Sequence, residues 1–339
     1  MTLPASLSEA IAIASEGRPE ALLGRTVAAM SDAYRRSGRP AGGSFDPNAA
    51  LAYALYRLPA TYAAIAAAFA QTSDARPAPT PASLLDLGSG PGTALWAARA
   101  VWPSLREAVA VERDAAMRGL GERLMRHANA QDVPNTRWLG NDLRALSVHT
   151  RADLVVLAYV LGELPEAERP PVVAALWRAA SDLLVLVEPG TPAGFERIRV
   201  ARDALRALGA YVVAPCPHDG ACPLQGDDWC HFSARLERAP AHRRLKGGTL
   251  GYEDEKFAFV AVARTAPLTR RSRVLRHPEV RPGHVVLTLC TGEGIRHRTV
   301  AKSAGDRYRV ARSLRWGASL PADGALPADG SGAPPRSPV

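Results

Sequence analysis

Short apolar runs alternate with longer helical patterns between residues 84 and 212. The runs SLLDLG, AVAVE, DLVVLAYV and LLVLVEP are apolar at most positions, and the stretches between them have helical periodicity. Strands that are apolar throughout are typical of a parallel sheet covered on both faces, because neither face then meets water. The alternation therefore predicts an α/β fold, with a parallel sheet built from right-handed βαβ units.

The regions on either side of this core have different patterns. Residues 1–73 are rich in alanine and broken by Gly and Pro, which predicts a helical cap, and residues 74–83 predict a Pro-rich linker. After the core of residues 84–212, residues 213–317 combine a cysteine-rich insert, the remaining core strands and a basic β module with runs such as HVVLTLCT. Residues 318–339 have the composition of a disordered tail.

The first twenty residues bear on the compartment. They carry Glu9 and Glu16 and no arginine before Arg18, so they resemble neither a signal peptide nor an Arg-rich transit peptide. No run approaches the length of about 18 apolar residues that suggests a membrane span. From these features we expect a cytoplasmic protein that is monomeric and makes no membrane contact.

The charge is spread unevenly along the chain. The formal net charge is +9, and residues 239–316 hold 17 Lys and Arg against 6 Asp and Glu, which gives this segment alone a net charge of +11. Such asymmetry indicates a polyanionic partner, most often nucleic acid. An arginine-rich composition without any such partner is the alternative. The basic residues considered for RNA contact are Arg243, Arg244, Lys246, Arg270, Arg271, Arg273, Arg276, Arg296, Arg298, Lys302, Arg307, Arg309, Arg312 and Arg315.

The stretch LLDLGSGPGTALWAA has a strand pattern that passes through three glycines into a helical pattern. Because Gly88, Gly90 and Gly92 lack side chains, a ligand can lie directly against the backbone at the start of the helix. A nicotinamide or flavin fingerprint would have its third glycine at position 93, where this chain has Thr93. The loop alone is a weak signal, since such glycines can also serve only to turn the chain.

Three acidic residues strengthen the interpretation of the glycine loop. Asp86 ends the strand before the loop, where a carboxylate can meet the cationic amino acid part of a ligand. Glu112 lies about 20 residues past the glycines, in the usual place of an acid that accepts both ribose hydroxyls. Asp142, together with Asn141, follows another strand-like segment and is a candidate to hold an adenine amino group. With the loop, these residues resemble the S-adenosylmethionine site of class I methyltransferases.

The segment after the fourth predicted strand carries no recognisable catalytic motif. Amino-group methyltransferases usually have Asn or Asp there, followed by Pro-Pro and an aromatic residue, whereas this chain reads LAYVLGELP. Tyr159 and Glu163 are placed to face the pocket, but neither is an obvious base. Two hypotheses follow: a non-catalytic protein that keeps the fold for binding, or an active rRNA methyltransferase. The catalytic residues are left unassigned.

Three of the four cysteines lie within CPHDGACPLQGDDWCHF, and the fourth follows 60 residues later. Clustered cysteines in a reducing compartment more often bind metal or do redox chemistry than form structural disulfides. Four thiolates suit either a tetrahedral zinc or an iron-sulfur cluster. The spacing lacks the C-x2-C pairs of zinc ribbons and the ferredoxin spacings, so it favours the cluster only slightly. It also lacks the C-x3-C-x2-C motif of radical S-adenosylmethionine enzymes, which excludes that class.

Several longer motifs resemble the methyltransferase-like protein 17 family of mitochondrial small-subunit assembly proteins and their bacterial homologues. They are VEPGTPAGF, CPHDGACPL, DWCHFSAR, HRRLKGG, YEDEKFAFVAVAR, GHVVLTLCT and RTVAKSAGDRYRVARSLRWG. The similarity runs from RLPATYAA, near residue 57, to about Trp316. It implies a methyltransferase-like Rossmann domain and a 4Fe-4S cluster on Cys216, Cys222, Cys230 and Cys290. It also implies association with small-subunit ribosomal RNA during assembly.

The combined prediction is an S-adenosylmethionine-binding, methyltransferase-like protein with an N-terminal helical cap and a C-terminal, cysteine-rich and basic β module. Its expected cofactors are S-adenosylmethionine and a 4Fe-4S cluster, with zinc the less favoured metal. His218 and His231 are alternative metal ligands, although contacts with the thiolates or with RNA suit them better. The expected partners are small ribosomal subunit rRNA and assembly intermediates.

Overall fold

The computed structural model describes residues 1–37, 44–129, 131–145, 150–226, 228–237 and 251–326. The first eight strands form one sheet in the order β3-β2-β1-β4-β5-β8-β6, with β7 paired to β8. Their bounds are β1 Ser83–Leu87, β2 Glu107–Val111, β3 Asn135–Leu139, β4 Ala152–Ala158, β5 Ala180–Pro189, β6 Tyr211–Ala214, β7 Phe232–Glu237 and β8 Tyr252–Ala263.

The strands of this sheet run in one direction except for β8. The pairs β1–β2, β1–β4, β2–β3 and β4–β5 are parallel, whereas β8 is antiparallel to β5, β6 and β7. Strand β1 lies in the interior of the sheet, and β8, between β5 and β6, runs antiparallel to its neighbours. This arrangement is typical of class I methyltransferases. The predicted α/β fold of this class is therefore confirmed.

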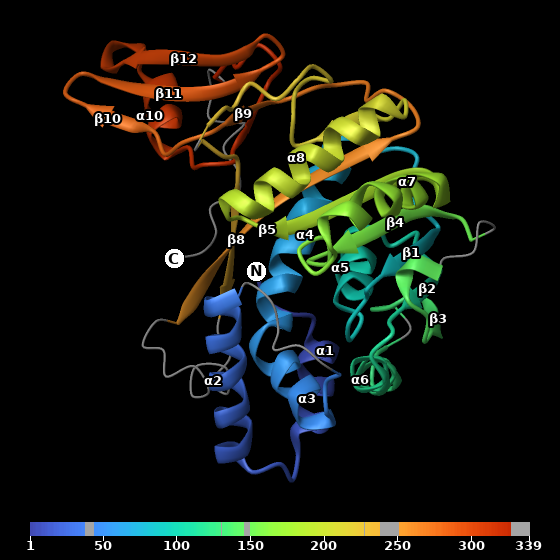
Figure 1. The fold of residues 1–339 in the computed structure, drawn as a ribbon. Helices are drawn as coiled ribbons and strands as arrows, with labels where there is room; N and C mark the ends of the chain where they lie inside the picture. Colours follow the sequence, from blue (N-terminus) through green and yellow to red (C-terminus); the bar gives the residue numbers. More distant parts are fainter. Residues whose placement is uncertain (38–43, 130, 146–149, 227, 238–250, 327–339) are drawn as a thin grey trace.

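Helices α4 Leu58–Ala75, α5 Thr93–Val101, α7 Arg169–Ala179 and α8 Pro192–Ala207 pack on the two faces of the sheet, as the apolar runs predict (Figure 1). Helices α1 Ala5–Ser15, α2 Glu20–Ser37 and α3 Pro47–Tyr56 pack mainly on other helices, among them α6 Ala115–Arg126. Alternate residues of β1 point to opposite faces: Leu84 packs with α4 and α5, and Leu85 packs with α7 and α8. Helix α4 packs directly on the sheet, beside α5, β7 and β8, so part of the N-terminal region belongs to the main core.

A second, smaller sheet follows β8 and lies at the top left of Figure 1, in orange and red. Its order is β10-β11-β9-β13, with β12 paired to β11. The bounds are β9 Ser272–Val274, β10 Glu279–Arg281, β11 His284–Thr291, β12 Gly294–Ala301 and β13 Ser319–Leu320, and α10 spans Asp306–Ser313. Val285, Leu287, Val310 and Leu314 give this sheet and α10 a core of their own.

Two further observations concern the ends and the surface of the chain. Strand β13 lies at the start of the segment for which the composition predicts disorder, and residues 327–339 of that segment lie outside the described residues. Of the helices that the structure describes, none is both long enough and apolar enough to cross a membrane.

Candidate functional site

The glycine loop joins β1 to α5 at the carboxyl edge of the sheet. Gly88, Gly90 and Gly92 have φ angles of +64°, +53° and +85°, in the region that favours glycine. A Cβ on Gly88 would come within 2.6 Å of the Val160 side chain, whereas a Cβ on Gly90 would meet nothing within 4 Å. The first glycine is therefore required by packing, and the second leaves open space beside the backbone where a ligand can approach.

Asp86 is the buried acid at the base of this loop. Its side chain is only 2% exposed, and its Oδ2 atom has no hydrogen-bond partner among the described residues. Burial, with a smaller contribution from the nearby Glu112 carboxylate, raises the pKa of Asp86 to about 8. A buried carboxyl group in this state accepts either a proton or a cationic ligand.

Glu112 follows β2 and closes the other side of the loop. One carboxylate oxygen accepts a hydrogen bond from the Gly90 N–H at 2.8 Å, and the other accepts one from the Asp114 N–H at 2.8 Å. Burial raises the pKa of Glu112, and these two backbone hydrogen bonds oppose the rise. Each oxygen keeps a further lone pair, so the carboxylate can still accept a hydroxyl donor from a ligand.

Asp142 lies near the same edge but faces other side chains. Its carboxylate accepts hydrogen bonds from Arg144 at 2.7 and 2.8 Å and pairs with Arg113 at 3.4 Å. The Arg144 hydrogen bonds hold the pKa of Asp142 well below its usual range. The structure thus brings Asp86, Glu112 and the three glycines together, whereas Asp142 is held in an ion-pair network beside them.

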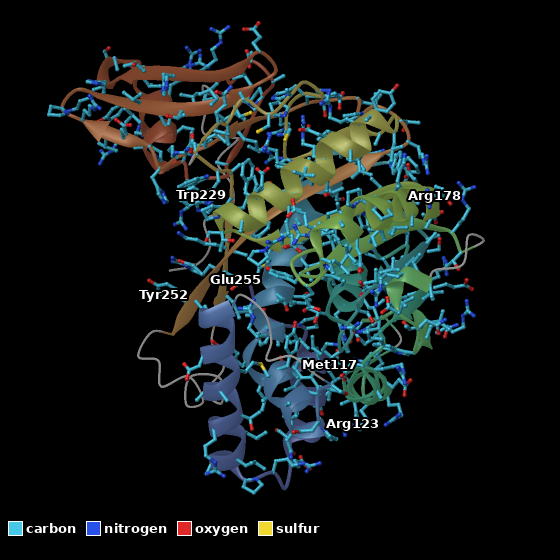
Figure 2. All side chains as sticks on the ribbon, viewed as in Figure 1. Met117, Arg123, Arg178, Trp229, Tyr252 and Glu255 are labelled. Atoms are coloured by element: carbon cyan, nitrogen blue, oxygen red, sulfur yellow. The ribbon has the colours of Figure 1, made fainter. Side chains whose placement is uncertain are left out.

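The carboxyl end of β4 holds a set of polar residues that sequence patterns did not identify as a group. Tyr159 has a φ of 62°, which is unusual for a residue other than glycine and is typical of functional or strained sites. Its hydroxyl donates to Glu255 of β8 at 3.4 Å, and Arg57 pairs with the same carboxylate at 3.1 Å. Figure 2 shows Glu255 on the part of β8 that faces the N-terminal helices. Arg57 and Glu255 are nearly 200 residues apart, so no local signal could have linked them.

This Tyr159 group lacks the features of a methyl-transfer base. Burial raises the pKa of the Tyr159 phenol well above its ordinary value, and the Glu255 carboxylate raises it further. The phenol therefore keeps its proton at neutral pH. The Glu255 carboxylate is in turn engaged by Arg57.

The four cysteines line one cavity between α8, the loop after β6 and the second sheet. Cys216, Cys222 and Cys230 are half-buried, and Cys290 on β11 is 7% exposed. The cavity has a volume of about 40 Å³, which exceeds the space that one water molecule needs. Its other walls are largely apolar, with Phe195, Leu224, Phe259 and Leu275 among them. The chain therefore brings together thiols that are up to 74 residues apart in sequence.

The surroundings of the thiols disfavour free thiolates. Burial raises the pKa of Cys222 and Cys230, and it raises the pKa of Cys290 to about 12. The other thiols add to each rise, because like charges repel, while Arg202 and Arg273 oppose it. In the described ranges, no group of three or more His, Cys, Asp or Glu side chains is arranged to hold a metal ion.

The two histidines of the cysteine stretch have different positions. His218 lines the cavity, with its Nε2 atom 3.9 Å from the Sγ atom of Cys290. His231 is 4% exposed and is packed between Trp229 and Trp316, at ring-centroid distances of 5.6 and 4.0 Å. His218 is therefore near a thiol, whereas His231 helps to pack the cysteine stretch against the second sheet.

The basic segment divides into buried and exposed groups. Arg270 pairs with Asp219 and Arg276 pairs with Asp228, so both attach the second sheet to the cysteine loop, and Arg273 is 5% exposed. Exposed cations of the second sheet and α10 are Arg281, Arg296, Arg298, Lys302, Arg307, Arg309, Arg312 and Arg315. Arg243, Arg244 and Lys246 lie outside the described residues.

Two mitochondrial proteins are similar in sequence to this chain. A human protein described as "Ribosome assembly protein METTL17, mitochondrial" is 35% identical over 295 residues, which cover 82% of this chain and 64% of that protein. The Rsm22-cox11 tandem protein 2, mitochondrial, of Schizosaccharomyces pombe is 28% identical over 71% of this chain and 38% of its own length. The chain thus spans less than two thirds of either relative. The resemblance to the methyltransferase-like protein 17 family is confirmed.

These relatives also correct one prediction. The first residues led us to expect a cytoplasmic protein, but the human and yeast relatives are both mitochondrial. The cytoplasmic expectation is therefore wrong, and the relatives point to the mitochondrion. The acidic start of the chain was a misleading signal, because it describes a few residues and not the whole protein.

Among solved structures, magnesium protoporphyrin IX methyltransferase from Synechocystis with bound SAM matches 73% of this chain and 97% of its own, at 13% identity and a TM-score of 0.40. A putative RNA methyltransferase from Pyrococcus horikoshii matches 54% of this chain and 74% of its own, at 15% identity and a TM-score of 0.35. The family model described as "Mitochondrial small ribosomal subunit Rsm22" matches residues 47–321, from the start of α3 to the end of β13. That range includes the glycine loop, all four cysteines and the second sheet, and the chain belongs to the Rsm22 family.

Proposed function

We propose that this protein assists assembly of the small ribosomal subunit, with S-adenosylmethionine at the glycine-loop site of Asp86, Gly88, Gly90, Gly92 and Glu112 and a 4Fe-4S cluster on its four cysteines. The observation that carries the proposal is the shared cavity of Cys216, Cys222, Cys230 and Cys290. These thiols come from the loop after β6, the approach to β7, and β11. A centre bound to all four would join the methyltransferase sheet to the second sheet.

Four thiols around one cavity can hold either a single zinc ion or a 4Fe-4S cluster, and the family resemblance favours the cluster. Zinc with Zn–S bonds of about 2.3 Å would hold its four sulfurs within roughly 4 Å of one another. A four-iron cluster is larger than one ion and holds its thiolates farther apart around a common space.

Features of the glycine-loop site support S-adenosylmethionine as its ligand. That molecule carries a sulfonium and an ammonium, and Asp86 presents a buried carboxyl group whose Oδ2 atom has no partner within the described structure. Glu112 would accept the ribose hydroxyls, and the open space at Gly90 would admit the ligand to the backbone. When bound, the ligand would supply a transferable methyl group, but the Tyr159 group offers no ready base for its acceptor.

The exposed cations of the second sheet and α10 support an RNA partner. Glu279, Glu293 and Asp306 pair with Arg281, Arg296 and Arg309. The remaining exposed cations are Arg298, Lys302, Arg307, Arg312 and Arg315, so positive charge is in excess on this surface. Phosphate groups of RNA would bind such a surface and release counterions. The human relative is a ribosome assembly protein and the family is described as a small ribosomal subunit family, which supports ribosomal RNA as the partner.

The proposal is tested by crosslinking to RNA in cells, followed by sequencing of the recovered RNA. We expect the wild type to recover small-subunit rRNA and the double variant Arg307→Ala with Arg312→Ala to recover less. Arg178→Ala is the matched control, because Arg178 is an exposed arginine on α7, well away from the second sheet (Figure 2). Recovery of no ribosomal RNA by the wild type would contradict the assembly role and favour a small-molecule methyltransferase.

A further inference from the structure

Arg273 was expected among the RNA-contacting cations, but the structure buries it beside the cysteines. It lies on β9 directly opposite Cys290 of β11, in an antiparallel pair. Residues directly opposite each other in such a pair have their side chains on the same face of the sheet. Arg273 is only 5% exposed, and it lines the cavity together with the four cysteines. It is thus a buried cation in the wall of the thiol cavity.

Arg273 donates a hydrogen bond to a backbone oxygen, and the Asp74 carboxylate raises its pKa less than the thiols do. Its Nε atom donates to the backbone oxygen of Pro215 at 3.0 Å, next to Cys216 in the chain. No carboxylate in the described part of the chain forms an ion pair with it, whereas neighbouring Arg270 and Arg276 pair with Asp219 and Asp228. Burying a charge is costly unless an opposite charge accompanies it. The position therefore indicates an anion within the cavity.

The pKa of this guanidinium agrees with that interpretation. Burial lowers the pKa of Arg273 to about 10, while negative charge on Cys230 and Cys216 raises it. Thiolates in the cavity would therefore favour the charged form of Arg273. Without a bound centre, burial leaves the thiols protonated and Arg273 without an anion.

A second buried arginine reaches the same cavity from α8. Arg202 is 3% exposed, and its Nη2 atom donates to the backbone oxygens of His218 and Gly220, at 3.0 and 2.7 Å. Its Nη1 atom pairs with Asp203 at 2.9 Å. Arg202 therefore holds the loop between Cys216 and Cys222 in place and adds positive charge beside the thiols.

We propose that Arg273, assisted by Arg202, is the counter-cation of the thiolate-bound cluster and raises its reduction potential. This inference rests on the proposed cluster. The core of an oxidised 4Fe-4S cluster is dicationic, so four thiolates make the whole centre a dianion. Accepting one electron makes it a trianion without forming or breaking a bond. A nearby cation stabilises the more negative state, and the net charge around a cluster is one of the factors that set its potential.

The experiment uses the full chain, purified anaerobically, as wild type, Arg273→Met, Arg273→Lys and Arg271→Met. Iron and sulfide are measured first, and the midpoint potential is then measured by titration with dithionite as the electron donor. We expect Arg273→Met to lower the equilibrium constant for reduction at least tenfold, about 59 mV for a one-electron couple. Arg273→Lys keeps the charge and should stay near the wild type. Arg271 is exposed and bonded to Ser319, so its variant should match the wild type.

A second measurement separates this role from simple packing. In the cluster-free protein, Arg273→Met removes a buried charge that has no anion, so its free energy of unfolding should rise or stay unchanged. A packing role alone predicts that the same variant is less stable with and without the cluster. An unchanged potential in Arg273→Met, in protein that carries iron and sulfide, would refute the inference and leave the cluster proposal standing.

Two other outcomes are decided by the same set of variants. If Arg273→Met fails to acquire iron and sulfide, loading of Arg273→Lys with a near-normal potential supports the charge role. Failure of both variants to load overturns it, because charge alone is then not what the site requires. If the wild type itself contains no iron and sulfide, the cluster proposal fails, and this inference fails with it.

Discussion

The glycine-loop site and the thiol cavity each contain a buried ionisable group, an acid in one and a base in the other. At the glycine-loop site, Asp86 is a buried acid whose Oδ2 atom has no partner in the described structure, and its surroundings raise its pKa to about 8. At the cavity, Arg273 is a buried cation that no described carboxylate pairs with, and burial lowers its pKa to about 10. In each site burial disfavours the charged form of the buried group, and a bound ligand of opposite charge would stabilise that form.

The two sites also differ in how the chain builds them. The glycine-loop site is formed by one strand–loop–helix unit and the acid after the next strand, within 27 residues from Asp86 to Glu112. The cavity needs the loop after β6, the start of β7 and two strands of another sheet. The glycine-loop site is therefore formed by segments that are close in sequence, whereas the cavity forms only when two sheets are correctly placed. Loss of a ligand from the cavity should thus destabilise the fold more than loss of a ligand from the glycine-loop site.

The largest expected effect follows from removing one thiol. Cys230→Ser should lose most of the iron and sulfide, and its free energy of unfolding should fall by several kcal/mol, because cluster binding and folding are linked. Iron and sulfide analysis with chemical denaturation checks both. Ser233→Ala, at an exposed position of β7, is the control. Stoichiometric zinc without sulfide in the wild type would show that the centre is not a cluster.

A smaller effect is expected when the Asp86 carboxyl group of the glycine-loop site is replaced by an amide. Asp86→Asn should weaken S-adenosylmethionine binding by about 1.5 to 3 kcal/mol, the range for hydrogen bonds to charged groups. Because Asp86 must lose its proton to meet a cation, wild-type affinity should rise from about pH 6 to about pH 7.5, and the variant should lack this rise. Calorimetry at both pH values measures it. Equal affinities at both pH values in the wild type would refute the contact.

The ligand-free protein should show the cost of that same carboxyl group. The folded state favours protonated Asp86, since its pKa is about 8 there and near 4 in the unfolded chain. The contribution of Asp86 to stability should therefore be greatest below about pH 4 and be lost as the pH rises to about 8. Asp86→Asn should be more stable than the wild type at about pH 9. Denaturation curves at both ends of this range test the difference, and parallel pH profiles for the two proteins would contradict it.

The smallest expected effect lies outside both sites, on the exposed cations. Binding to single-stranded RNA should weaken steeply as salt rises, with a slope near 0.7 per phosphate contact. Arg307→Ala should reduce that slope by about one contact's worth and weaken binding to all RNA sequences about equally. Arg178→Ala should leave the slope unchanged. A slope that does not differ between wild type and Arg307→Ala would place the RNA contact elsewhere.

The glycine-loop site was largely predictable from the sequence, whereas the full set of four cysteines followed only from the resemblance to a known family. Asp86, the three glycines and Glu112 follow from strand ends, because the carboxyl ends of parallel strands meet at one edge of a sheet. Asp142 was expected beside an adenine, but it pairs with Arg144, two residues later in the chain, and with Arg113 of another loop. Ion pairs between exposed loops depend on geometry that spacing does not encode.

The sequence by itself determined the strands of the main sheet, the glycine turn and the separation of a basic C-terminal region. These features depend on local apolar periodicity, on backbone angles and on composition, all of which act over short distances in the chain. Only the tertiary structure decided that Arg273 lies buried opposite Cys290, and not at the surface with the other arginines. The reason is strand register: a shift of one residue between β9 and β11 would turn Arg273 to the other face of the sheet, and the register is fixed by packing that involves the whole chain.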